Sequence, residues 1–364
     1  MTIGKRKGYT AKGAGAEPGD DASKRVGGSL SKNDHWYLQQ GFGFVNDPGK
    51  VASLGHEASG GMINDYTEPG SGKHYRAHIF TASGVFEVTK ASEDYPGIEY
   101  LVVGGGGAGG SIDGQCGGGG AGGLVTNYPG ITNQGGSMTR PAFPVSDGDS
   151  LTVTIGAGGG GWNGKSPYSR LPGYNSSLGP TLIAYGGGAG GSIAAGEKLG
   201  KSGGSGGGSG CVNPPSDGGP GYGDRDGSPQ SQTGTPLTPT DFPQGRPGGT
   251  GGPYEPGYFG AGGGGAWGQG INGGGAGGTG YGGRGVQVKI SGPPTVDQPM
   301  GTPGPSPGGG YFAGGGGGGG NSGHSPQANT EGGAGGGGAG IGGGPPGSPP
   351  DTKGVSGQRS TGGG

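Results

Sequence analysis

The stretch Tyr100-Leu101-Val102-Val103-Gly104-Gly105-Gly106-Gly107-Ala108-Gly109-Gly110 shows the pattern of the whole chain: a short apolar run leads directly into a block of glycine. The pattern recurs where Ile155 leads into residues 156–161 and where Tyr185 leads into residues 186–191. Further glycine blocks, separated by proline-rich or polar loops of variable length, follow at 203–210, 260–265, 273–278, 314–320 and 332–340. The sequence therefore predicts a quasi-repeat of glycine rod plus loop, without a fixed period.

The amino-acid composition excludes most classes of globular protein. Glycine accounts for 113 of the 364 residues and proline for 31, whereas an ordinary domain has about 7% and about 5%. The hydrophobic share is 26%, so a conventional core can occupy only a fraction of the chain. Collagen is excluded because the glycines come in blocks and not at every third position. A disordered low-complexity chain and a stack of extended glycine helices remain, and we favour the second.

Consecutive glycines can form a lattice of rods in the polyglycine II arrangement. This conformation has three residues per turn, a rise of about 3.1 Å and no internal hydrogen bonds, so its backbone groups point outward toward neighbouring rods. Side chains at most positions would block the close approach. We expect the alanines within the blocks to face outward or to lie at the lattice edge; they are Ala108, Ala121, Ala189, Ala276 and Ala334. We expect the flanking aromatic residues to cap the lattice ends; they are Trp162, Tyr185, Trp267, Tyr311 and Phe312. The same glycines, unpaired, would be flexible linkers.

The β signal is concentrated in the first half of the chain. Residues 75–80 and 85–89 are rich in β-forming side chains and flank Ser83-Gly84, which predicts a hairpin. Three more runs are predicted as strands, at 98–103, at 151–155 after an Asp147-Gly148-Asp149 turn, and at 181–185. A late strand is predicted at 286–290. Short strands separated by turn signals indicate a small sandwich.

The predicted fold is mostly β and irregular, with a small β-sandwich-like region, an array of packed polyglycine II helices and very little α-helix. We divide the chain into a docking arm (residues 1–60), a β region with the first glycine rods (61–185), and rods with proline-rich loops (186–364). The arm is basic at its start and aromatic at its end, which suits attachment to another protein. Its candidate docking residues are Lys5, Arg6, Lys7, Trp36, Tyr37, Phe42 and Phe44.

Catalytic and cofactor chemistry is not predicted. Residues 104–109 match the glycine spacing of a dinucleotide-binding loop, but the glycine-rich sequence that follows cannot form the helix which that site needs. An enzyme with a nucleotide site there is the alternative in a different class. His74 and His78 share a strand face without a third metal ligand nearby, so no metal site is expected. Cys116 and Cys211 are expected to be small buried residues without a disulfide.

The bulk charge and hydropathy also exclude some partners. The formal net charge is −2, which gives no general attraction to nucleic acid. No run of about 18 apolar residues is present, so membrane insertion is not expected. No apolar segment follows the basic residues 5–7, so a secretory signal is not expected either.

Part of the chain resembles the glycine-rich domain of marine bacteriophage virion proteins, especially those of cyanophages. The matching stretches are His78–Val88, Glu99–Gly110, Leu151–Gly159 and Asn175–Leu178, about a third of the chain. The resemblance implies a tail fibre or adhesin-like appendage located on the virion, homotrimeric as such fibres usually are, and transfers no binding residue. Chains of this kind usually end in an apolar closing strand, whereas this one stops at Ser360-Thr361-Gly362-Gly363-Gly364. We therefore expect the natural protein to continue.

The expected function is that of a structural virion appendage that forms a stiff glycine-rich fibre and mediates attachment to a host surface. Its expected partners are further copies of itself, other tail or capsid proteins through the arm, and a host glycan or protein. Loops 211–259 and 291–310 are the candidate contact regions, with Tyr222, Tyr254, Tyr258 and Phe259 as the candidate contact residues. Two alternatives are an extracellular polymerising nanofibre or matrix protein and a capsid decoration fibre.

Overall fold

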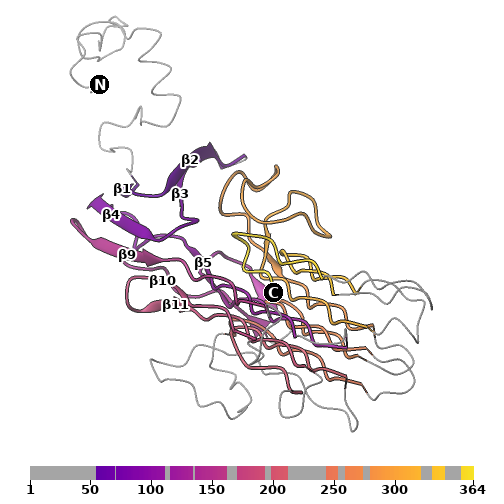
Figure 1. Cartoon of the computed structure of the whole chain (residues 1–364). Helices are drawn as coiled ribbons and strands as arrows, with labels where there is room; N and C mark the ends of the chain where they lie inside the picture. The colour runs from indigo at the N-terminus through magenta and orange to yellow at the C-terminus, as the bar shows by residue number, and fades with distance from the viewer. Residues whose placement is uncertain are drawn as a thin grey trace, which may run out of the picture.

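The structure is a computed structural model that combines short antiparallel sheets with an array of extended rods (Figure 1). It describes residues 55–69, 71–110, 115–133, 136–161, 170–192, 198–211, 243–252, 259–273, 279–320, 330–340 and 354–364, and these ranges contain no helix. The strands are β1 (Glu57–Ser59), β2 (Met62–Thr67), β3 (His74–Ile79), β4 (Gly84–Lys90), β5 (Leu101–Val103), β6 (Leu124–Thr126), β7 (Thr132–Asn133), β8 (Gly136–Ser137), β9 (Ser150–Thr154), β10 (Ser176–Leu178), β11 (Leu182–Ala184), β12 (Val286–Gln287) and β13 (Tyr311–Phe312). The prediction of a mostly β and irregular chain is confirmed.

The largest sheet has five strands in the order β1-β4-β9-β10-β11. The predicted turn that leads into β9 is present, with Gly148 at a φ of 84°, where glycine is favoured over other residues. The predicted hairpin between residues 75–80 and 85–89 is wrong. β3 pairs with β2 and β4 pairs with β1 and β9, so Ser83-Gly84 carries the chain from one sheet to another.

The β5–β6 pair packs against the five-stranded sheet and gives this end of the molecule its sandwich-like core. Phe86 and Val88 of β4 lie in one buried cluster with Val125 of β6 and Leu182 of β11. The alternation in β4, where Phe86 and Val88 are buried and Glu87 is exposed, is that of a strand with one face toward a core. The predicted small β-sandwich-like region corresponds to these two layers.

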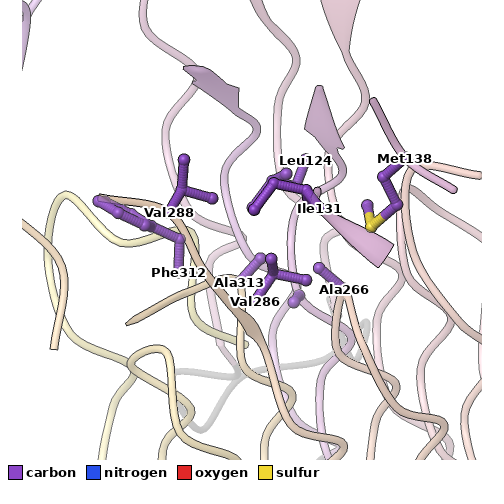
Figure 2. Close-up of a cluster of buried hydrophobic side chains, with 9 residues drawn as sticks. Leu124, Ile131, Met138, Ala266, Val286, Val288, Phe312 and Ala313 are labelled. Atoms are coloured by element: carbon purple, nitrogen blue, oxygen red, sulfur yellow. The ribbon is translucent and has the colours of Figure 1, made fainter. Parts of the chain in front are cut away.

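A second apolar core lies where the rods meet the late strands (Figure 2). Val286 and Phe312, opposite each other in the β12–β13 pair, pack there with Leu124 of β6. The rod alanines Ala266 and Ala313 belong to the same cluster. Phe312 therefore packs in one cluster with alanines of the rods, and its role in capping the lattice stays a prediction.

The glycine blocks form hydrogen-bonded rods with a period of three residues. Along rod 104–110, every third N–H donates to the antiparallel rod 117–123, in the pairs Gly104–Gly123, Gly107–Gly120 and Gly110–Gly117 (2.8–3.0 Å). The intervening Gly105 and Ala108 donate to a different segment, at Tyr174 and Leu171. A three-residue period with successive groups pointing to different neighbours is the polyglycine II pattern.

Rod 260–266 shows the pattern on three sides. Its N–H groups at 260, 263 and 266 donate to carbonyls of residues 319, 316 and 313, and those at 261 and 264 donate to residues 209 and 206. The remaining N–H groups, at 262 and 265, donate to residues 271 and 268. Every amide of this buried segment is therefore paired with another rod, as buried backbone groups require.

Rod 117–123 is surrounded by other rods on all sides. Its hydrogen-bonded neighbours are residues 104–110, 185–191, 205–208, 261–264, 316 and 362. Some of these precede residue 185 and others follow it. The β region with its first rods and the later rods therefore share a single lattice.

Steric exclusion explains why these positions are glycine. A Cβ added at Gly118 would overlap the Gly316 carbonyl, and one added at Gly119 would overlap the Gly107 carbonyl. The expectation that the alanines face outward is wrong for Ala108, Ala121 and Ala189, which are buried. Ala121 instead belongs to the apolar cluster at the end of the lattice. Ala276 and Trp162 lie outside the described residues.

The lattice predicts a sharp contrast between buried and exposed glycines. Gly118→Ala should lower the free energy of unfolding by about 1–3 kcal/mol or more, because the new methyl group overlaps backbone that has no room to move. Gly109→Ala is the matched control, since Gly109 is exposed and a Cβ there would come no closer than 3.8 Å to any atom, so the change should stay within about 0.5 kcal/mol. Urea unfolding of both variants measures the difference, and equal destabilisation would contradict the lattice.

Candidate functional site

The rods place most of their connections at one end of the lattice. Strands β5 and β11 lead directly into rods 104–110 and 186–192, so these rods run away from the sheets. The directions of the other rods follow from their hydrogen-bonded pairs. The rod ends that lie far from the sheets are residues 110 and 115, 161 and 170, 192 and 198, 252 and 259, 273 and 279, 320 and 330, and 340 and 354. We call this end the tip.

Tyr222, Tyr254 and Tyr258, three of the four predicted surface-contact residues, lie outside the described residues. The nearest described residues, at 211, 252 and 259, lie at the tip. Tyr254 and Tyr258 lie in the sequence between residues 252 and 259, both of which are at the tip. The segment with Tyr222 begins at the tip, after Cys211, and ends beside Gln244 near the sheets, where Gln244 receives hydrogen bonds from Leu124 and Tyr185. Phe259 does not fit the prediction. It is only 9% exposed, and its ring occupies the space beside Gly320, so it is an interior residue.

Loop 291–310 lies at the opposite end from the tip. It joins β12 to β13, and Asn64 of β2 donates to the Ser291 carbonyl at 2.7 Å. The Tyr66 hydroxyl of the same strand donates to the Ile290 carbonyl. Gln298 donates back to the Pro293 carbonyl at 2.8 Å, which ties the loop to itself. Loop 291–310 is therefore separated by the length of the lattice from Cys211 and from residues 252 and 259, which lie at the tip.

The N-terminal arm also starts at the end with the sheets. The described chain enters at Gly55 and forms β1, which pairs with β4 at the edge of the five-stranded sheet. The candidate docking residues Lys5, Arg6, Lys7, Trp36, Tyr37, Phe42 and Phe44 lie outside the described residues. The point where the described chain begins and the tip are therefore at opposite ends of the lattice.

The glycine spacing at residues 104–109 does not form a phosphate-binding loop. The N–H groups of Gly104, Gly105 and Gly107 already donate to carbonyls of neighbouring rods at 2.8–3.0 Å. A phosphate site needs free amides at a helix N-terminus, and the described residues after Gly110 continue as another rod.

The histidines singled out in the sequence have ordinary partners. His78 lies 2.7 Å from the Gly60 carbonyl through Nδ1, and His74 lies 3.0 Å from the Thr67 hydroxyl. Within the ranges that the structure describes, no group of three or more His, Cys, Asp or Glu side chains could hold a metal ion.

A tyrosine and carboxylate cluster near the sheets was not predicted. Tyr66 and Tyr75 face each other across β2 and β3 with ring centroids 5.4 Å apart. Burial, and then the Glu99 carboxylate, raise the pKa of both phenols. Burial, followed by Glu68, raises the pKa of Glu99 itself. The proline and glycine residues between Pro69 and Gly72 were the sequence signal that could have predicted the β2–β3 hairpin.

Cys116 and Cys211 lie on adjacent rods at the tip. They form no disulfide and both are buried, as the sequence predicts. The Cys211 amide donates to the Gln115 carbonyl at 2.9 Å. Burial raises the pKa of the Cys211 thiol to about 11, so the thiol keeps its proton at neutral pH.

Comparison with known families identifies a glycine-rich domain. A family model for the glycine-rich domain matches residues 81–364. This chain belongs to the glycine-rich domain family. No curated protein and no solved structure matches the chain significantly. Among the described residues of this glycine-rich domain protein, no helix has the length and apolar character needed to cross a membrane.

The buried thiol predicts slow chemical labelling in the folded protein. In a Cys116→Ala variant, where labelling reports on Cys211 alone, iodoacetamide at pH 8 should react at least about 100-fold more slowly than in urea. The reason is that the raised pKa and the burial both remove the reactive thiolate. The raised pKa of Cys211 also means that the free energy of unfolding falls as the pH rises above about 9, because the thiol then ionises more readily in the unfolded chain than in the folded one. Labelling at similar rates in both states would show that the rods open at the tip.

Proposed function

We propose that this protein is a structural appendage of a virus particle, of the phage tail fibre or adhesin type, that attaches the particle to a host surface. The observation that carries the proposal is the polarity of the lattice. The described chain begins at Gly55, at the end with the sheets, and most of the rod ends that flank the variable connections lie at the other end. The resemblance to virion proteins supports the same assignment.

The lattice suits a mechanical role because its cohesion comes from the backbone. Each inter-rod hydrogen bond contributes roughly 0.5–1.5 kcal/mol net, and the bonds of a rod such as 260–266 point in three directions. Bending one rod therefore disturbs bonds to several others. A body of this kind holds its tip in a fixed orientation, which lowers the entropy cost of binding by the connections it presents.

The proposed partners follow from the two ends. The arm binds a tail or capsid protein through its basic and aromatic residues. The tip binds a host glycan or protein, with Tyr222, Tyr254 and Tyr258 in its connections, because tyrosine supplies a large contact area at low entropy cost. Copies of the chain associate with one another.

Labelling of purified particles tests the appendage role. Gold-conjugated antibodies raised against the recombinant chain should mark an extended structure on the particle. Label spread over the capsid shell would favour a capsid decoration fibre instead. Label on free filaments, with none on particles, would overturn the proposal in favour of a matrix or nanofibre protein.

Substitution of the tip tyrosines tests the attachment role. The triple variant Tyr222→Ala, Tyr254→Ala and Tyr258→Ala should reduce adsorption of the protein to host cells at least about 10-fold, because large anchors of this type dominate binding energy. Tyr95→Ala is the matched control, since Tyr95 is an exposed tyrosine at the end with the sheets. Adsorption is measured with fluorescent protein on cells. An unchanged triple variant, or an equal loss in the control, would contradict a tip-based receptor site.

A further inference from the structure

Rod 156–161 occupies an edge of the lattice. Its Gly159 amide donates to Gly106 at 2.8 Å, and Ala157 and Gly160 accept from Tyr174 and Leu171. These bonds attach the rod on its inner side only. Ala157, Gly158, Gly160 and Gly161 are exposed.

Packing within the chain does not explain three of the glycines in this rod. A Cβ at Gly156 or Gly159 would overlap the Tyr174 or Leu171 carbonyl, so those positions need glycine. A Cβ at Gly158 would come no closer than 3.7 Å to any atom, one at Gly160 would be 3.7 Å from the Leu171 side chain, and one at Gly161 would meet nothing within 4 Å. None of the three has the positive φ that would favour glycine.

The outward backbone groups of the rod lack partners in the described part of the chain. There, neither the N–H nor the C=O of Gly158 or Gly161 takes part in a hydrogen bond. The two residues are three apart, so they lie on the same face of a three-residue helix. The rod thus resembles the edge strand of a sheet, whose unpaired groups are a template for another chain.

Other outer rods carry exposed side chains that prevent a further rod from packing against them. Ile271 and Tyr281 are 44% and 41% exposed on neighbouring outer rods, and Val355 is 66% exposed on the rod that pairs with residues 336–339. A further rod could not approach closely across these side chains. Rod 156–161 is therefore a distinctive edge in the described lattice, bare of side chains beyond Ala157.

We propose that rod 156–161 pairs with the same rod of a second copy of this chain, antiparallel about a two-fold axis. A partner for this edge must itself be a rod without outward side chains, and in the described residues rod 156–161 provides one. A surface that offers both donors and acceptors is complementary to itself, as a two-fold interface requires. The exposed Leu171 and Tyr174 lie three apart on the adjacent segment and flank the pair with apolar contacts.

The test compares self-association of the intact chain with that of two variants. Sedimentation velocity over a range of concentrations should show a monomer–dimer equilibrium for the natural sequence. The double variant Gly158→Val and Gly161→Val should raise the dissociation constant at least about 10-fold without lowering the thermal midpoint of the monomer, because both positions open to solvent. Ser356→Val, at an exposed position on another rod, is the control and should leave the dissociation constant unchanged.

Several outcomes would overturn the pairing. A natural chain that stays monomeric, a dimer that tolerates both valines, or a trimer that they do not weaken would each exclude this edge as the interface. Disulfide trapping gives an independent readout, because antiparallel pairing places residue 158 of one copy opposite residue 161 of the other. A mixture of Gly158→Cys and Gly161→Cys chains should therefore cross-link faster than either variant alone, and equal rates would contradict the register. Because the pairing points the two tips in opposite directions, it describes the association of free chains, and the particle-labelling experiment tests the proposed function separately.

Discussion

The hydrogen bond between bare backbone rods is the interaction on which the rest of this structure depends. A chain with so few apolar side chains cannot offset its conformational entropy with a large core. It instead brings rods close enough for N–H groups to pair with neighbours in three directions, as at residues 260–266. Because a single Cβ at a position such as Gly118 would overlap a carbonyl, this cohesion excludes side chains and fixes the composition.

The two apolar cores complement the lattice by setting its register. Rods of glycine alone could slide by three residues and recover the same bonds. Ala121, Ala266 and Ala313 prevent this, because they belong to the apolar cluster with Phe312 at one end of the rods. At the other core, Val125 packs against the five-stranded sheet. The sheets thus hold one end of the lattice, and the connections at the tip can vary without disturbing its register.

The sequence predicted the fold class and the rods but not their neighbours. The runs at β4 and β9 and the turn at Gly148 were readable because apolar alternation and turn chemistry are local. Strand β2 was missed because Asn64 and Asp65 have low β propensity, and its pairing with β3 overturned the expected hairpin. Which rod lies beside which was not predictable, since glycine carries no side chain to specify a partner. For the same reason, burial of Phe259 and the separation of loop 291–310 from the tip appeared only in the structure.

Residue-resolved amide hydrogen exchange tests the lattice most directly. If the rods are paired as described, the amides of residues 260–266 should exchange only on global unfolding, with protection equal to that of β4 and β9. The amides of Gly158 and Gly161, measured at a concentration low enough to keep the chain monomeric, should exchange at rates close to those of an unstructured peptide. Fast exchange throughout residues 260–266 in the folded protein would contradict the account, because those glycines would then be linkers and not rods.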